Sequence, residues 1–139
     1  MDKIVDHIEE VVMVVKNQDE AVALYEDLFG FQFDRSWDMP PYEMKVKSAM
    51  VGQTQFHILG STNPAPEAFL NKFIEKKGEG IHHIAFSVNH LGETVARLRA
   101  KGARIIPGGK TNVGGEEVDF HFVHPGSTHG LLIELVGRK

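Results

Sequence analysis

The stretch that decides the fold is Ile81-His82-His83-Ile84-Ala85-Phe86-Ser87-Val88. It is short and rich in β-branched and aromatic residues, which is typical of a strand. Residues 91–101 follow with helical spacing and stop before Gly102. Three further strands are expected at residues 103–107, 118–123 and 131–136. The second half of the chain therefore predicts the order strand, helix, strand, strand, strand.

The first half predicts the same order. The valine-rich run at residues 8–15 indicates a strand, and Asn17 is suited to cap a helix that stops at Gly30. Its later strands are expected at residues 31–37, 42–51 and 54–59, and a loop at 61–66 with a helix at 67–77 joins the halves. The chain is therefore expected to be α+β, with two βαβββ modules pairing into a cupped, mostly antiparallel sheet.

An internal repeat relates the two halves. Aligning residues 16–23 with residues 89–96 matches a Glu, a Val and an Ala. Extending that register backwards places Glu10 against His83, and the last strands of the two halves place His57 against Glu134. Each half thus carries a polar, metal-competent residue in its first strand and another in its last.

These four residues predict a metal site. A carboxylate inside an apolar strand, such as Glu134, is costly unless it is paired or bound to a cation. Two imidazoles and two carboxylates suit one divalent ion such as Zn, Ni, Co, Mn or Fe. The first ligand stays open, because a one-residue slip of the strand would exchange Glu10 for Glu9.

Composition narrows the classes of function. The 139 residues are 42% hydrophobic with a formal charge of −4, which gives no reason to expect nucleic acid as a partner. No apolar run has the length of a membrane span, and the N-terminus lacks the pattern of a signal peptide, so we expect a cytoplasmic protein. The chain has no cysteine, which excludes disulfides and thiolate ligands.

The motifs resemble a known family. Residues 81–88, the helix after them, and the run from Gly114-Gly115 through His124-Pro125 to residues 130–135 are similar to methylmalonyl-CoA epimerases. Those enzymes belong to the vicinal-oxygen-chelate superfamily, with glyoxalase I, extradiol dioxygenases and the fosfomycin and bleomycin resistance proteins. The resemblance covers nearly the whole chain. It implies one vicinal-oxygen-chelate domain over residues 1–139, with module one at about 5–62, a linker helix at about 64–79 and module two at about 80–138.

The resemblance also implies a divalent metal on the concave face of the sheet. His83 and Glu134 fall on the family's third and fourth metal positions. His57 falls on the second, where epimerases carry glutamine or glutamate, and Glu10 falls on the first, where they usually carry histidine. His7 lies three residues before Glu10 and is a reserve first ligand if the first strand shifts. No subfamily is matched at all four positions.

The reaction implied is removal of a proton next to a carbonyl, in a substrate whose two neighbouring oxygens chelate the metal. We expect an epimerase or isomerase acting on a 2-substituted acyl-CoA thioester, with Glu134 as base and Glu10 as a second acid–base residue. The alternatives are a glyoxalase I-like lyase acting on a hemithioacetal, an extradiol-type dioxygenase, and a non-catalytic drug-binding protein. A homodimer is expected by resemblance and as the common default.

Other polar residues are weaker candidates. Glu43 is a further carboxylate, expected to be a solvated strand residue. A polar cluster around the last hairpin is expected to be exposed, although its His124-Pro125 segment resembles one near the substrate tail in the family; the cluster comprises Asp119, His121, His124 and His129. Basic residues that could meet phosphates are Lys45, Lys47, Arg104 and Lys110.

Overall fold

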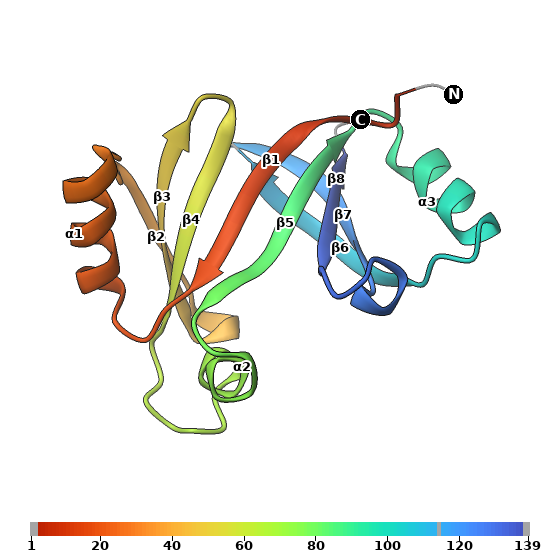
Figure 1. Cartoon of the computed structure of the whole chain (residues 1–139). Helices are drawn as coiled ribbons and strands as arrows, with labels where there is room; N and C mark the ends of the chain where they lie inside the picture. Colours follow the sequence, from red (N-terminus) through yellow and green to blue (C-terminus); the bar gives the residue numbers. More distant parts are fainter. Residues whose placement is uncertain (1–2, 114, 138–139) are drawn as a thin grey trace. The chain divides into compact units, whose positions relative to one another are not determined.

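The computed structural model describes residues 3–113 and 115–137 as a mixed α+β chain (Figure 1). Its elements are β1 (Val5–Val14), α1 (Gln18–Phe29), β2 (Arg35–Met39), η1 (Pro40–Tyr42), β3 (Met44–Val51), β4 (Thr54–Ser61), α2 (Phe69–Lys77), β5 (Gly80–Val88), α3 (Leu91–Ala100), β6 (Ile105–Val113), β7 (Glu116–Val123), η2 (Pro125–Ser127) and β8 (Ile133–Gly137). The order strand, helix, strand, strand, strand occurs twice, on either side of α2, as the sequence predicts.

The chain divides into two compact units. Unit 1 comprises Met1–Glu10 and His83–Lys139, and unit 2 comprises Val11–His82. Strands β1 and β5 each contribute to both units. The exact limits of the two βαβββ modules stay a prediction.

Unit 2 is an antiparallel sheet with a helix on each face. Strand β3 pairs antiparallel with β2 and with β4. Ile58 packs with Val22 of α1, whereas the next residue, Leu59, packs with Leu70 of α2. Neighbouring residues of a strand point to opposite faces, so α1 and α2 cover different sides of β4. Figure 1 shows α1 lying alongside the β2–β3–β4 sheet.

Helix α1 has the ends that the sequence predicts. The side chain of Asn17 accepts a hydrogen bond from the backbone N–H of Glu20, and Gly30 ends the helix at φ 70°. Gln18 is buried in the first turn, where its amide donates to the carbonyl oxygens of Ile58 and Lys45. Those two bonds fix the start of α1 on the sheet.

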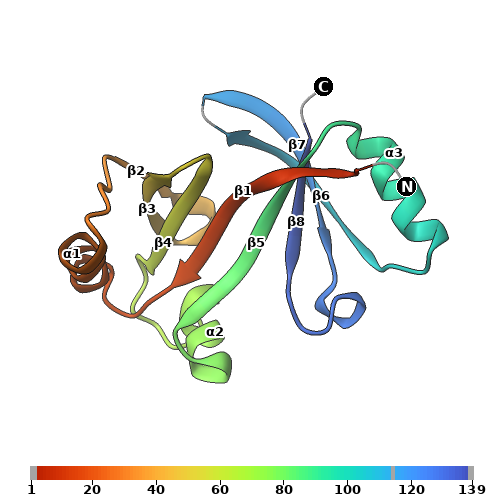
Figure 2. The ribbon, with the colours of Figure 1, turned by 45° about the horizontal axis from the view of Figure 1, so that its top comes forward.

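Unit 1 has a mixed sheet covered by α3 on one face. Strand β5 runs parallel to β8, which pairs antiparallel with β7, and β7 pairs antiparallel with β6. Leu91 and Val95 of α3 pack on a core that includes Val88 and Leu135. Figure 2 shows α3 beside this sheet. The opposite face of β5 and β8 carries polar side chains.

Several boundaries differ from the expected ones. Residues 31–34 are not part of a strand, because Phe31 and Phe33 leave the ladder to pack on Tyr25 and Phe56. Helix α2 begins at Phe69 instead of residue 67, since a hydrogen-bonded turn from Ala65 to Ala68 precedes it.

In the second half, β6 is longer and β8 begins later than expected. Strand β6 continues past Pro107 to Val113, because its register shifts between Pro107 and Gly109 and pairing with β7 then resumes. Strand β8 starts at Ile133 instead of residue 131, because a hydrogen-bonded turn comes just before it. In this turn the hydroxyl of Thr128 donates to the carbonyl of Leu131, and the backbone N–H of Gly130 donates to the carbonyl of Pro125.

Helices long and apolar enough to cross a membrane are absent from residues 3–113 and 115–137.

Candidate metal centre

Three side chains from three strands of unit 1 meet at one point. Glu10 is the last residue of β1 that belongs to unit 1. His83 comes from β5 and Glu134 from β8. Each offers one ligand atom, and these atoms all lie within 4.8 Å of one another. Nε2 of His83 lies 3.7 Å from Oε1 of Glu134. The structure thus brings together three of the four residues that the sequence analysis expects as metal ligands.

Strand pairing explains how His83 and Glu134 meet. In the parallel β5–β8 ladder, Glu134 lies directly opposite Ala85. His83 is two residues before Ala85, and residues two apart on a strand share a face. Both polar side chains therefore leave the sheet on the same side. Phe86 and Val88 alternate with them and pack on the opposite side, in the core beneath α3.

The cluster is largely shielded from water. Glu10 and Glu134 are 9% and 8% exposed, and His83 is partly buried. Burying two carboxylates next to each other is unfavourable unless a cation or a hydrogen-bond donor compensates their charge. The His83 imidazole supplies part of that compensation, and a divalent cation would supply more.

The donor set fits such a cation. Nitrogen and oxygen ligands sit about 2.0–2.2 Å from zinc, so ligand atoms around one ion are at most about 4.4 Å apart. The observed spread of up to 4.8 Å is within a few tenths of an ångström of that limit. One imidazole and two carboxylates suit a borderline or hard divalent ion. The three side chains can therefore converge on one ion with small adjustments.

An aromatic wall borders this cluster. Phe122 of β7 pairs directly with Glu134 across the antiparallel β7–β8 ladder. Its ring meets the His83 imidazole edge to face, with centroids 5.8 Å apart. Phe120 meets Phe122 in the same way at 5.7 Å. The sequence analysis did not single out these rings, although alternation along β7 places both on the face of Glu134.

His7, the reserve first ligand, lies elsewhere. The cluster contains Glu10, and His7 is an odd number of residues away, so it points to the other face of β1. Its Nδ1 lies 2.9 Å from Asp6 and its Nε2 lies 3.4 Å from Glu9. The hydrogen bond from His7 holds the pKa of Asp6 below its usual value. Glu9 is one residue from Glu10 and so points to the opposite face of β1, where it lies near His7.

His57 belongs to unit 2 and is buried there, with 6% of its surface exposed. It pairs with Ser48 across β3 and β4. Its Nε2 lies 3.3 Å from Oε1 of Gln55, and Trp37 meets its ring edge to face at 5.3 Å. Its role as the fourth ligand stays a prediction from the internal repeat.

The weaker candidates have local roles. Glu43 is not a strand residue: it caps the short helix η1 at φ 52° and accepts a hydrogen bond from the amide of Asn63. Lys110 pairs with Asp119 at 2.8 Å, which raises the pKa of this lysine. His124 accepts from the backbone N–H of Gly126 and so shapes η2. The expectation of Glu43 as a residue of a middle strand was wrong, because the chain turns there.

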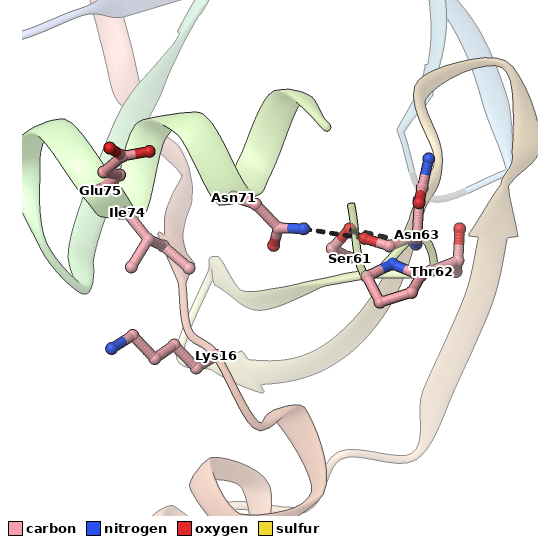
Figure 3. Close-up of a pocket in the computed structure, with 8 residues that line it drawn as sticks. Lys16, Ser61, Thr62, Asn63, Asn71, Ile74 and Glu75 are labelled. Atoms are coloured by element: carbon pink, nitrogen blue, oxygen red, sulfur yellow. Dashed lines mark hydrogen bonds between the residues drawn. The ribbon is translucent and has the colours of Figure 1, made fainter. Parts of the chain in front are cut away.

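A surface pocket of about 760 Å³ lies in unit 2, beside α2 (Figure 3). Lys16, Asn71 and Glu75 contribute to its lining. On its loop side, the amide of Asn71 and the hydroxyl of Ser61 both donate hydrogen bonds to the carbonyl oxygen of Asn63. The pocket therefore borders a loop that is held in place by hydrogen bonds. The sequence analysis did not single out the residues that line it.

Comparison with known proteins identifies the family. The pattern of the Glyoxalase/Bleomycin resistance protein/Dioxygenase superfamily matches residues 9–122. The chain belongs to this superfamily. The matched region contains Glu10, His57 and His83 and ends before Glu134. The family resemblance stated from the sequence is thereby confirmed.

Curated relatives include epimerases. The chain is 27% identical over 135 residues to the ethylmalonyl-CoA/methylmalonyl-CoA epimerase of Cereibacter sphaeroides, covering 94% of this chain and 97% of the relative. It is 34% identical over 131 residues to the mitochondrial methylmalonyl-CoA epimerase of Dictyostelium discoideum, covering 90% of this chain and 74% of the relative.

Solved structures show the same fold. The methylmalonyl-CoA epimerase of Mycobacterium tuberculosis superposes with a TM-score of 0.83 at 24% identity, covering 100% of this chain and 92% of that one. The glyoxalase-like fold predicted from the sequence is confirmed. Membership of the superfamily, together with the Glu10–His83–Glu134 cluster, implies a divalent metal ion.

Proposed function

We propose that this protein is a metal-dependent epimerase that removes and returns the proton next to the carbonyl of a 2-substituted acyl-CoA thioester. The observation that carries the proposal is the buried Glu10–His83–Glu134 cluster in a chain similar to methylmalonyl-CoA epimerases. A cluster of two carboxylates and an imidazole offers both ligands for a cation and groups that accept a proton.

The metal is proposed to bind through Glu10, His83 and Glu134. His57 is proposed as a fourth ligand on the strength of the internal repeat alone. When bound, the ion acts as a Lewis acid that makes the proton next to the carbonyl more acidic. Its identity among Zn, Ni, Co, Mn and Fe is left to measurement.

Glu134 is proposed as the base. Its carboxylate accepts the substrate proton, the electrons of the broken C–H bond pass into the thioester carbonyl, and the protonated residue on the other side returns a proton to the opposite face of that carbon. Glu10 is proposed as this second acid–base residue. Two carboxylates within 4.8 Å of His83 and of each other supply the two groups that inversion of one carbon requires.

The Phe120–Phe122 pair assists this chemistry by keeping water away. Phe122 is the direct cross-strand partner of Glu134 and touches His83 through its ring. Apolar rings at this side of the site limit the access of bulk water to the two acid–base residues.

The CoA thioester, the homodimer and the cytoplasmic location belong to the same proposal. Relatives named for methylmalonyl-CoA and ethylmalonyl-CoA support the thioester. Among soluble homo-oligomers, the closed two-fold dimer is the commonest. Light scattering on the purified protein measures this state directly.

The donor set favours the epimerase over the extradiol dioxygenase. Ring-cleaving members of the superfamily resemble one another in using two histidines and one carboxylate around iron, whereas this cluster has one histidine and two carboxylates. The converging ligands also favour an enzyme over a purely drug-binding protein. The glyoxalase-like lyase shares the proton transfer and is distinguished by its substrate.

The experiment is proton exchange in deuterated solvent. Methylmalonyl-CoA and ethylmalonyl-CoA are incubated with protein reconstituted with each divalent metal in turn, and loss of the α-proton signal is followed by NMR. We expect exchange with the wild type, loss of at least a hundredfold in Glu134→Gln, and unchanged exchange in Glu26→Gln, an exposed residue of α1. Wild-type protein that exchanges neither substrate with any metal contradicts the proposal, and turnover of a hemithioacetal would then favour the lyase.

A further inference from the structure

A row of polar side chains crosses the sheet of unit 2. Arg35 of β2 pairs with Ser48 of β3, and Ser48 pairs with His57 of β4, so all three side chains share one face. Gln55 lies two residues before His57 on that same face. Gln55 and His57 are 5% and 6% exposed. The row therefore lies on the side of β4 opposite to α1.

Arg35 fixes the orientation of the Gln55 amide. Nη2 of Arg35 lies 2.7 Å from Oε1 of Gln55 and 3.4 Å from the hydroxyl of Ser48. A guanidinium has only donors, so the amide atom that faces it must be the oxygen and not the NH₂ group. A bond of this length to a charged donor holds that orientation more firmly than a neutral pair would.

The oriented amide in turn constrains His57. Nε2 of His57 lies 3.3 Å from the same Oε1 of Gln55. A carbonyl oxygen has two lone pairs and no proton, so it accepts from both Arg35 and His57. Nε2 of His57 must therefore carry the proton. In the neutral imidazole the lone pair then resides on Nδ1.

Packing holds the ring in that position. The ring of Trp37 meets the His57 imidazole edge to face at 5.3 Å. Rotation of a ring that is 6% exposed would break this contact and the bond to Gln55 together.

We propose that Arg35 and Gln55 are positioning residues that hold neutral His57 as its Nε2–H tautomer, so that Nδ1 is the nitrogen with which His57 binds a cation. The tautomer follows from contacts within unit 2. Only the step from Nδ1 to a metal rests on the proposed function. Metal-binding histidines commonly have their other nitrogen held by an oxygen acceptor, and Gln55 would be that acceptor here.

Ring-nitrogen NMR on the metal-free protein tests the tautomer. Protein with ¹⁵N-labelled histidine is observed at about pH 8.5, where an ordinary histidine is neutral, and His57→Asn assigns the His57 signals. We expect the protonated nitrogen to couple to both ring carbon-bound protons, which identifies it as Nε2. A protonated Nδ1 in the wild type would overturn the proposal.

Variants test the two positioning residues. Gln55→Glu keeps the oxygen acceptor and should keep the Nε2–H tautomer. Gln55→Leu removes it, and Arg35→Leu lets the amide turn its NH₂ group toward His57, so both should raise the Nδ1–H fraction. The matched control is Gln53→Leu in the exposed β3–β4 turn. An unchanged tautomer in both leucine variants, with folding verified by their NMR spectra, would overturn the role of Gln55 and Arg35.

Zinc titration separates this inference from the proposed function. Zn²⁺ bound as proposed should shift the Nδ1 signal of His57 and leave Nε2 protonated. A shift of Nε2 instead, or one bound ion per chain with no change at His57, overturns the ligand assignment. Failure to bind any ion would contradict the proposed function, while the tautomer in the metal-free protein would still be decided by the first measurement.

Discussion

Nε2 of His83 lies 3.7 Å from Oε1 of Glu134, although the two residues are far apart in the sequence. Their meeting follows from the parallel pairing of β5 with β8, which sets Glu134 opposite Ala85. Glu10 completes the cluster from β1. This relationship brings the predicted ligands of unit 1 into one cluster, which we propose as the metal site.

Phe122→Ala should weaken the site without unfolding the protein. The ring supports the edge of the His83 imidazole at 5.8 Å, so its removal gives His83 additional rotamers and admits water beside Glu134. Loss of such a support typically costs about tenfold to a hundredfold in metal affinity. Competition against a chelating dye measures that affinity. Phe122→Leu should retain most of it, and an equal loss in both variants would show that the aromatic edge is not what supports His83.

Gly108→Ala should destabilise unit 1. A Cβ at this position would come within 2.3 Å of the carbonyl oxygen of Phe120 and within 2.6 Å of its ring. The backbone must move at the irregularity of β6, which costs about 1–3 kcal/mol in the free energy of unfolding. Urea denaturation measures the change.

Gly109→Ala is the matched control for that variant. Its Cβ would meet only the edge of the Phe120 ring, at 3.9 Å, which is an ordinary contact. We expect its urea midpoint to stay close to that of the wild type. Equal midpoints for Gly108→Ala and Gly109→Ala would contradict the close approach of β6 to Phe120.

His7→Ala should change the titration of Asp6. The hydrogen bond from His7 lowers the pKa of Asp6, so the pair is favourable above the ordinary carboxyl pKa and is lost as the pH falls through the lowered value. Without His7, the Asp6 carboxyl should titrate closer to 3.8. Carboxyl ¹³C NMR follows this residue. An unchanged Asp6 titration would show that His7 does not donate to it in solution.

The sequence was informative wherever a periodic pattern carried the signal. The repeat placed Glu10 and His83 at equivalent positions of β1 and β5, and Glu134 stood out as a carboxylate in the apolar run that forms β8. Once β1 is known to include residues 7–10, side-chain alternation places Glu10 on the opposite face of the strand from His7 and Glu9. The meeting of these three residues and the α+β order could therefore be predicted.

Other features depend on contacts between distant residues and could not be predicted in this way. The row from Arg35 to Gln55 and His57 requires the register of β2, β3 and β4, which no local pattern encodes. The length of β6 depends on Gly108, where a shift in pairing lets the strand continue beyond Pro107. Phe31 and Phe33 have strand-like composition, yet packing on Tyr25 and Phe56 outweighs their β propensity.

The most direct test of the central claim is the metal content of the purified protein, measured by elemental analysis after reconstitution and removal of loosely bound ions. We expect about one divalent ion per chain in the wild type and in His7→Ala, and almost none in His83→Ala, Glu134→Ala or Glu10→Ala. Wild-type protein without a bound ion, or full metal content in the three cluster variants, would contradict the assignment of Glu10, His83 and Glu134 as the metal centre.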